Sequence, residues 1–332
     1  MGNERLASAR ERESIKGQQE RVLQIVVDAM SERGLHWVRD WKCFLEPPRN
    51  PYTGTVYQGG NALNLALIAM ANGWEDSRWI TLGQLRREAA KARERGEEWD
   101  WRGQQASLVV KYKEVVRYER DEDGRAVLDE DGNKVVAYRG LEPCRPAYVL
   151  NMAQVKGAPA EERRPRAAVA FDPAAADRLA ASCVCPVDEG DYPGACYVPA
   201  CDCIRIPSRD FFSSAEGFAS TLAHEYVHAT GAPQRLNREQ GGGFGSMAYA
   251  YEELVAELGS VLVCSHLGFA YEGVSDVENH AAYLAGWLRA FREEDGARRL
   301  QTAFSKAQAA CAFIVERLDA VQGAGRGLSA AA

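Results

Sequence analysis

The stretch Thr221–Gly231, TLAHEYVHATG, decides how the rest of this chain is interpreted. It contains the pattern H-E-x-x-H, formed by His224, Glu225 and His228, inside a segment with helical character. Histidines four residues apart lie on the same face of a helix, so both imidazoles can reach one Zn²⁺ ion at about 2.0–2.1 Å. Glu225 projects beside them and can act as general base toward a metal-bound water. The alternative is an amphipathic helix with two partly buried histidines.

The sequence also indicates where this helix begins and ends. Ser213 with Glu216 fits a capping box, in which the serine is the N-cap and the glutamate is the third helical residue. Gly231 is suited to end the helix. A zinc-binding helix of about four turns is therefore expected.

A second helical segment, Tyr249–Gly259, supplies acidic groups for the same site. A catalytic zinc needs a third protein ligand, and Glu253 is assigned that role. Glu257 lies four residues on, where a carboxylate can orient a ligating histidine. Glu252 points about 100° away on the helix and is the fallback ligand. The alternative is a solvated acidic face, but the neighbouring apolar residues make a poor place for unpaired carboxylates.

Length and composition bound the class of protein. A chain of 332 residues is long enough for two domains, and a hydrophobic content of 46% is sufficient for each to form a hydrophobic core. No apolar run approaches the roughly 18 residues of a membrane span. The N-terminus is charged and lacks the apolar segment of a secretory signal. A cytoplasmic protein is therefore expected, with no membrane partner.

The charge is distributed unevenly. Residues 1–170 hold 28 Lys and Arg against 26 Asp and Glu, a net charge of +2. Residues 171–332 hold 12 against 21, a net charge of −9. Direct nucleic-acid binding by the second half is therefore not expected, and the first half would need a local patch with aromatic stacking.

Cysteines raise a separate question. There are nine, and since nothing marks the chain as secreted, free thiols are expected. A second metal site is conceivable where five of them cluster, although C-x-C pairs lack the usual spacing of zinc ligands and short strands explain them as well. The five are Cys183, Cys185, Cys196, Cys201 and Cys203.

The predicted fold class is α+β. Helical patterns over residues 12–33, 62–71 and 81–95 precede strand patterns from Ser107, where Asp131-Gly132 signals a hairpin. Further helices are expected over 174–182, 275–294 and 296–321, with short strands that end at 203–207. The expected organisation is an N-terminal α+β domain, 1–158, a linker, 159–166, a mainly helical zinc-binding domain with a small sheet, 167–322, and a disordered tail, 323–332.

Residues 49–61 form a turn-dense loop that could bind single-stranded nucleic acid. Glycines allow close backbone approach, arginine and amide groups suit phosphates, and Tyr57 with Trp74 or Trp79 could stack bases. A structured loop that caps a small domain would show the same pattern. Asn61 is also a good N-cap for the helix that follows. The candidate DNA-binding residues are Arg49, Asn50, Thr53, Gly54, Tyr57 and Asn61.

Four other residues are weaker candidates near the zinc site. His280 is either a rival third ligand or a core histidine. Tyr249, Tyr251 and Arg235 are candidates to stabilise an oxyanion, since a hydrolytic metal site benefits from a donor aimed there.

Two groups of motifs together resemble the ArdC-like antirestriction proteins. Pro48-Arg49-Asn50-Pro51-Tyr52-Thr53-Gly54, Trp79-Ile80-Thr81 and Leu150-Asn151-Met152-Ala153-Gln154 resemble their N-terminal single-stranded-DNA-binding domain, which also occurs in primases of the TraC type. The H-E-x-x-H followed by Ala229-Thr230-Gly231, together with Tyr249 to Leu258, resembles their zincin-like metallopeptidase domain. One departure is the acidic, aromatic segment 95–101, where the family carries a basic turn.

The resemblance implies a protein of a plasmid, phage or other mobile element. It would bind single-stranded DNA, protect incoming DNA from restriction and carry one zinc ion in a gluzincin-type site. A different hypothesis is a working zinc metallopeptidase, in which a zinc-bound water attacks a peptide bond with Glu225 as base. Its N-terminal domain would then deliver it to a protein substrate such as a restriction enzyme.

Overall fold

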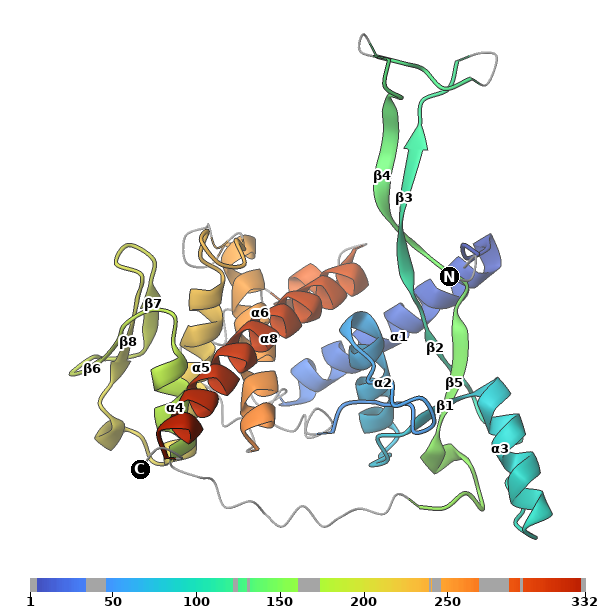
Figure 1. Cartoon of the computed structure of the whole chain (residues 1–332), viewed down its shortest axis with the longest axis horizontal. Coiled ribbons are helices and arrows are strands. Elements are labelled where there is room, and N and C mark those ends of the chain that lie inside the picture. The colour runs from blue at the N-terminus through green and yellow to red at the C-terminus, as the bar shows by residue number, and fades with distance from the viewer. Residues whose placement is uncertain are drawn as a thin grey trace. The chain divides into compact units, whose positions relative to one another are not determined.

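The computed structural model describes residues 5–33, 46–121, 125–129, 132–160, 174–238, 240, 246–268, 287–292 and 295–329. The chain divides into two compact units (Figure 1). The first comprises Met1–Glu20 with Trp79–Ala158, and the second comprises Arg21–Arg78 with Pro159–Ala332. Residues 21–78, which the sequence analysis assigned to the N-terminal domain, thus pack with the second half of the chain. The predicted α+β class is confirmed.

The first unit is built on a small antiparallel sheet in the order β1-β5-β2. Helix α3 follows β1 and begins with a capping box of Thr81 and Gln84. Ile80, Leu85 and Leu150 are at most 1% exposed and form the centre of its core. The elements are β1 (Trp79–Thr81), α3 (Leu82–Glu94), β2 (Ser107–Val109), β5 (Ala147–Asn151) and the 3₁₀ helix η3 (Met152–Gln154).

A separate two-stranded ribbon joins β2 to β5 in sequence. Strands β3 (Tyr112–Tyr118) and β4 (Val136–Pro143) pair antiparallel, with an irregularity between Arg117 and Tyr118. This confirms the expected hairpin. Gly132, at a φ of +79°, occupies the left-handed conformation that favours glycine.

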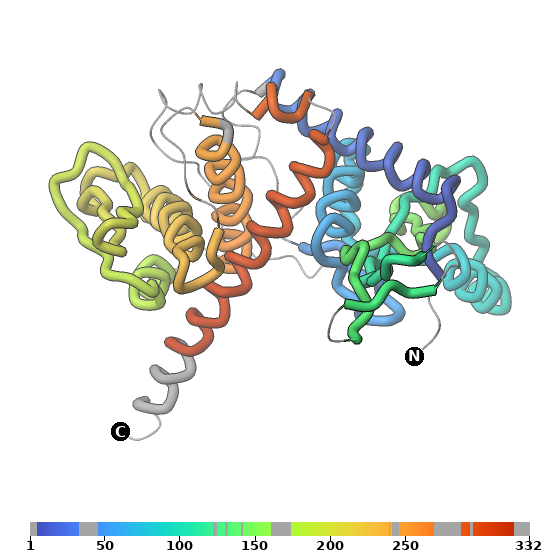
Figure 2. The backbone as a smooth tube through the Cα atoms, turned by 90° about the horizontal axis from the view of Figure 1, so that it is seen from above, coloured from blue at the N-terminus to red at the C-terminus, as the bar shows by residue number. Residues whose placement is uncertain are grey.

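The second unit is a layer of helices with a three-stranded sheet in the order β6-β8-β7. Helix α8 lies along α6, and α5 packs against α6 (Figure 2). The helices are α2 (Gly59–Ala71), α4 (Ala174–Ser182), α5 (Ala215–Thr230), α6 (Met247–Leu267), α8 (Gly296–Ser329) and the 3₁₀ helix η4 (Arg209–Phe211). The strands are β6 (Val187–Gly190), β7 (Cys196–Val198) and β8 (Cys203–Pro207). Helix α1 (Ala9–Arg33) contributes to both units.

Three helix ends differ from expectation. The N-cap of α5 is Ser214, whose Oγ accepts a hydrogen bond from the Gly217 amide at 2.9 Å, so the capping box predicted at Ser213 is wrong by one residue. Helix α2 begins at Gly59 with Gln58 as its N-cap, three residues before the N-cap predicted at Asn61, and the Gly59 amide donates to Oε1 of Gln308 at 2.5 Å. Helix α8 continues to Ser329, through most of the segment expected to be disordered; glycine weakens a helix without forbidding it.

Cys201 and Cys203 form a disulfide, so the expectation of free thiols is wrong for this pair. Within the described ranges, the cysteine-rich segment forms no group of metal ligands. No helix of the described residues is both long and apolar enough to cross a membrane.

Candidate metal centre

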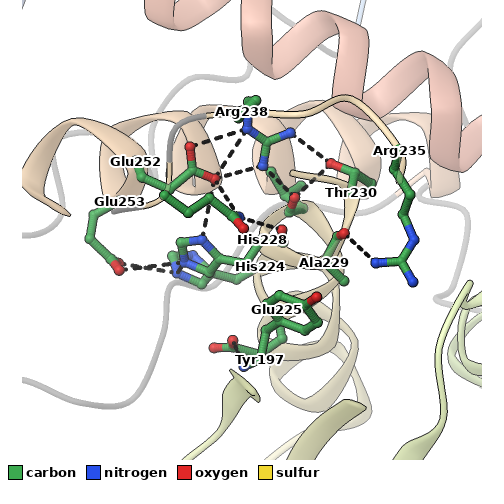
Figure 3. A network of polar contacts seen from close by, with 12 residues as sticks. Tyr197, His224, Glu225, His228, Ala229, Thr230, Arg235, Arg238, Glu252 and Glu253 are labelled. Carbon is green, nitrogen blue, oxygen red and sulfur yellow. Dashed lines mark hydrogen bonds and ion pairs between the residues drawn. The ribbon is translucent and has the colours of Figure 1, made fainter. Parts of the chain in front are cut away.

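Helices α5 and α6 bring His224, His228 and Glu253 together (Figure 3). The two Nε2 atoms lie 3.2 Å apart. Nε2 of His224 is 3.4 Å from Oε2 of Glu253, and Nε2 of His228 is 3.4 Å from Oε1 of the same carboxylate. All the possible ligand atoms lie within 4.8 Å of one another. The group predicted from the sequence is therefore brought to one point.

A glycine lets the two helices approach closely enough for this. Gly259 of α6 faces Val227 of α5, and a Cβ atom at Gly259 would lie 2.9 Å from Cγ2 of Val227. Real side chains do not pack that closely, so any larger residue would push the helices apart. The spacing of Glu253 from the histidines thus depends on a residue that the sequence analysis did not single out.

The three residues fit a divalent cation. Two imidazole nitrogens and a carboxylate oxygen are the donor set of many zinc sites, and His224 and Glu253 are 3% and 7% exposed. Burial lowers the pKa of both histidines, but Glu253 outweighs this effect and holds each pKa above its ordinary value. Burial would raise the pKa of Glu253, but the two imidazoles outweigh this effect and hold the pKa well below its ordinary value. Glu253 therefore stays ionised and places its negative charge beside the two imidazoles, whose neutral form supplies nitrogen donors to a cation.

Glu257 and Glu252, the two acids outside the predicted ligand set, do not lie where they were expected relative to the histidines. Oε1 of Glu257 lies 3.9 Å from Nδ1 of His224, beyond hydrogen-bond distance, and that buried nitrogen has no hydrogen-bond partner among the described residues. Glu252, predicted as the fallback ligand, instead lies behind His228, with Oε1 3.5 Å from its Nδ1. Glu252 is thus placed to orient an imidazole and not to replace Glu253.

A buried arginine holds Glu252 in place. Arg238 donates from Nη2 to Oε1 of Glu252 at 2.6 Å and from Nε to both carboxylate oxygens at 3.1 Å. It also donates to the Val227 carbonyl at 2.6 Å and to Oγ1 of Thr230 at 2.8 Å, which ties the end of α5 to α6. Burial opposes ionisation, but His228 and Arg238 lower the pKa of Glu252 to about 2. No local pattern around Arg238 indicates this role, and the sequence analysis missed it.

Glu225 lies beside the three ligands on α5 and is 5% exposed. Its Oε2 accepts a hydrogen bond from the Tyr197 amide at 2.7 Å. Tyr197 belongs to β7, an edge strand of the sheet. The second oxygen, Oε1, makes no hydrogen bond to any described residue. The carboxylate is therefore held in one orientation with one oxygen available to accept a proton.

The candidates for oxyanion stabilisation are used elsewhere. Both Nη atoms of Arg235 bind the carboxylate of Asp202, at 2.6 and 2.8 Å, and Nη1 also donates to the Ala229 carbonyl. The hydroxyl of Tyr251 faces α8, 3.5 Å from the Arg299 carbonyl. Arg235 and Tyr251 thus make structural contacts and do not take the role in oxyanion stabilisation that was expected of them. Tyr249 is half-buried, and His280 lies outside the described residues.

The loop predicted to bind DNA is ordered by Asn50. This residue is 4% exposed, and its Oδ1 accepts hydrogen bonds from the amides of Tyr52 and Thr53 at 3.0 and 3.2 Å. Asn50 therefore shapes the turn and does not present its amide outward. Gly54 is exposed at a φ of +69°. Burial raises the pKa of the half-buried Tyr57, and a hydrogen bond with Asn50 opposes the shift.

The remaining loop candidates differ in exposure. Thr53 is exposed, while Arg49 and Asn61 are half-buried. Trp79 is 0% exposed, so the prediction that it could stack a base is wrong. Trp74 is half-buried.

Comparison with known proteins agrees with this architecture. Residues 16–141 match the model of the N-terminal domain of anti-restriction factor ArdC, and residues 174–306 match that of a zincin-like metallopeptidase. A DNA primase TraC of Escherichia coli is 32% identical over 282 residues, which are 83% of this chain and 25% of the primase. The chain thus spans about a quarter of that relative. Uncharacterized protein y4eC of Sinorhizobium fredii (strain NBRC 101917 / NGR234) is 32% identical over 306 residues, 87% of this chain and 88% of the relative.

Two solved structures extend the likeness to three dimensions. The metal-free antirestriction protein ArdC from plasmid R388 is 28% identical with a TM-score of 0.64, and the alignment covers 91% of this chain and 97% of ArdC. Its Mn(II)-bound form is also 28% identical, with a TM-score of 0.61 and coverage of 90% and 97%. In this chain the match to the ArdC N-terminal domain comes first and the zincin-like match second, and the alignment with ArdC itself covers nearly the whole length. The chain belongs to the family of ArdC-like antirestriction proteins.

Proposed function

We propose that this protein is a single-stranded-DNA-binding antirestriction factor of a plasmid, phage or other mobile element, with a gluzincin-type site for one Zn²⁺ ion. The observation that carries the proposal is the convergence of His224, His228 and Glu253 in a chain that matches ArdC along nearly all of its length. We place its action in the cytoplasm, where incoming single strands meet restriction enzymes.

His224, His228 and Glu253 would hold the metal, and Glu252 would fix the orientation of His228 through Nδ1. Such an ion supplies Lewis acidity when bound. ArdC from R388 was solved with Mn(II), whereas two imidazoles and one carboxylate favour zinc in a buried site. Titration of the metal-free protein with Zn²⁺ and Mn²⁺, followed by calorimetry, tests metal identity and stoichiometry.

The loop 49–61 would contact the strand. Arg49 suits a phosphate, Gly54 allows close backbone approach, and Tyr57 would stack a base while Asn50 keeps the turn in shape. The test is a titration of fluorescent single- and double-stranded oligonucleotides at two salt concentrations. We expect single strands to bind more tightly, with affinity that falls as salt rises.

Paired variants separate the loop from the metal site. Arg49→Ala with Tyr57→Ala should weaken binding by roughly tenfold or more, since each stacked base contributes about 1–3 kcal/mol. Glu225→Ala should bind as the wild type does. Unchanged affinity in the double variant would show that the strand binds elsewhere.

A second candidate function is that of an active zinc metallopeptidase with a protein substrate such as a restriction enzyme. The observation that favours it is the anchoring of Glu225 by the Tyr197 amide. Oε1 of Glu225 would accept a proton from the nucleophile that attacks the peptide bond. The hydrogen bond from the Tyr197 amide to Oε2 would keep Oε1 in position. Glu225→Gln retains all metal ligands, so it should abolish proteolysis and leave metal content and DNA binding intact. Antirestriction activity that survives this substitution would exclude a requirement for proteolysis.

A further inference from the structure

The second unit contains a cavity apart from the three metal-ligand candidates. It has a volume of about 400 Å³ and lies between α6, the helical residues 287–291 and the beginning of α8. Tyr251 lines it from α6, whereas the next two residues, Glu252 and Glu253 of the metal site, face α5. This volume is in the range of sites for small organic ligands. Neither the metal site nor the loop 49–61 uses this space.

The charged lining of the cavity is mainly cationic. Among the described residues, Arg298, Arg299 and Lys306 line it together with one carboxylate, Asp295. Arg299, Thr302 and Lys306 recur at intervals of three and four positions, so they share one face of α8, and Arg298 lies next to Arg299. Within the described residues, neither Arg298 nor Lys306 forms an ion pair. The first turn of a long helix adds a partial positive charge at the same place. The cavity therefore attracts an anion.

Its other walls are aromatic. Trp287 and Phe291 are 5% and 3% exposed and form a fixed apolar floor. Nε1 of Trp287 donates to the Ala250 carbonyl of α6, which locks the indole. The half-buried ring of Tyr251 also lines the cavity, with Nζ of Lys306 4.8 Å from its centroid. A planar group could stack on Tyr251 while an attached anion reaches the cations beside it.

We propose that this cavity binds a nucleoside phosphate. The phosphate would contact Arg298 and Lys306, because guanidinium and ammonium groups form strong charge-assisted hydrogen bonds with phosphate oxygens. The base would stack against Tyr251, as aromatic side chains do with bases. Two sources share this chemistry: a free mononucleotide and the 5′-phosphorylated end of a DNA strand. The site goes beyond the proposed function, since it lies on different residues from loop 49–61.

The first test is calorimetric titration of the full chain with dAMP, adenosine and inorganic phosphate at low and high salt. Saturable binding of dAMP is expected, at least about tenfold tighter than binding of either half of the molecule, and weakened by salt. Arg298→Glu and Lys306→Glu should each weaken dAMP binding by about tenfold or more. The matched control is Arg289→Glu, an exposed position on the neighbouring segment that does not line the cavity.

The outcomes decide the proposal. If Arg289→Glu and Arg298→Glu lose equal affinity for dAMP, the effect comes from the net charge of the protein and the proposed site is wrong. The proposal is also wrong if the wild type does not bind dAMP. Thermal unfolding midpoints of the variants check that each one is folded. Tyr251→Phe, which keeps the ring, should retain affinity, whereas Tyr251→Ala should lose it.

A comparison of 5′-phosphorylated and 5′-hydroxyl oligonucleotides distinguishes the two sources. A preference for the phosphorylated end that Arg298→Glu removes identifies a strand end. Binding of dAMP without such a preference identifies a free nucleotide. The Arg49→Ala, Tyr57→Ala variant should still bind dAMP, so failure of loop 49–61 and failure of the cavity give different results.

Discussion

Arg238 should be the most sensitive buried charge behind the metal site. The side chains of Arg238 and Glu252 are 4% and 6% exposed, and the arginine makes five hydrogen bonds shorter than 3.2 Å to Glu252, Thr230 and Val227. Arg238→Met would leave a buried carboxylate without its cation and the Val227 carbonyl without this donor. Removal of one partner of such a pair costs about 3–5 kcal/mol. We expect a loss of that size in the free energy of unfolding.

A double-mutant cycle tests the reasoning. Glu252→Gln alone leaves the buried Arg238 without its carboxylate partner and should also destabilise the protein. The combination Arg238→Met, Glu252→Gln removes both charges. Its cost should fall short of the summed single costs by about 2 kcal/mol or more. Arg102→Met is the control, since the Arg102 side chain is 87% exposed and its ion pair with Asp100 should contribute little to stability.

The measurement is urea unfolding in the presence of a chelator, so that metal affinity does not contribute. Native-state hydrogen exchange of the α5 amides reports on this unit even when the two units unfold separately. Additive single costs, or a loss below about 1 kcal/mol for Arg238→Met, would refute the view that the pair is tightly coupled.

Four further predictions follow from single contacts. Gly259→Ala should destabilise by about 1–3 kcal/mol, because the new methyl group meets Val227, and thermal unfolding should show partial recovery when Val227→Ala is added. Saturating Zn²⁺ at about 100 times its Kd should stabilise the protein by about 2.7 kcal/mol, and a chelator or His228→Ala should remove this gain. Hydrogen bonds from its arginine partner lower the pKa of Asp202, so its contribution is present above the ordinary value of 3.8 and is lost as pH falls below it; Asp202→Asn should flatten the acid limb of a stability–pH curve. Asn50→Ala should cost about 1 kcal/mol and weaken single-strand binding, whereas unchanged binding would show that the turn has no role in it.

Local sequence patterns determined the parts of this protein that depend on short spacings. The four-residue intervals of His224 with His228 and of Glu253 with Glu257 place each pair on one helical face, whatever surrounds the helix. The N-terminus of α3 at Thr81 and the turn at Gly132, across which Leu128 pairs with Lys134, likewise follow from residues a few positions apart. These features could be predicted because helix and hairpin geometry fixes them locally.

The tertiary structure alone decided which distant groups meet. The contact of Tyr197 with Glu225 spans 28 positions, and that of Gly59 with Gln308 spans 249. Spacing already predicted Glu253 as the third ligand, but only the packing of α6 on α5 and the position of Arg238 place Glu252 behind His228 and not among the candidate ligands. Burial of Trp79 is similarly a property of the assembled core. Periodicity specifies the face of a helix on which a side chain lies, but the partner of that face is chosen by long-range packing, which has no local sequence signature.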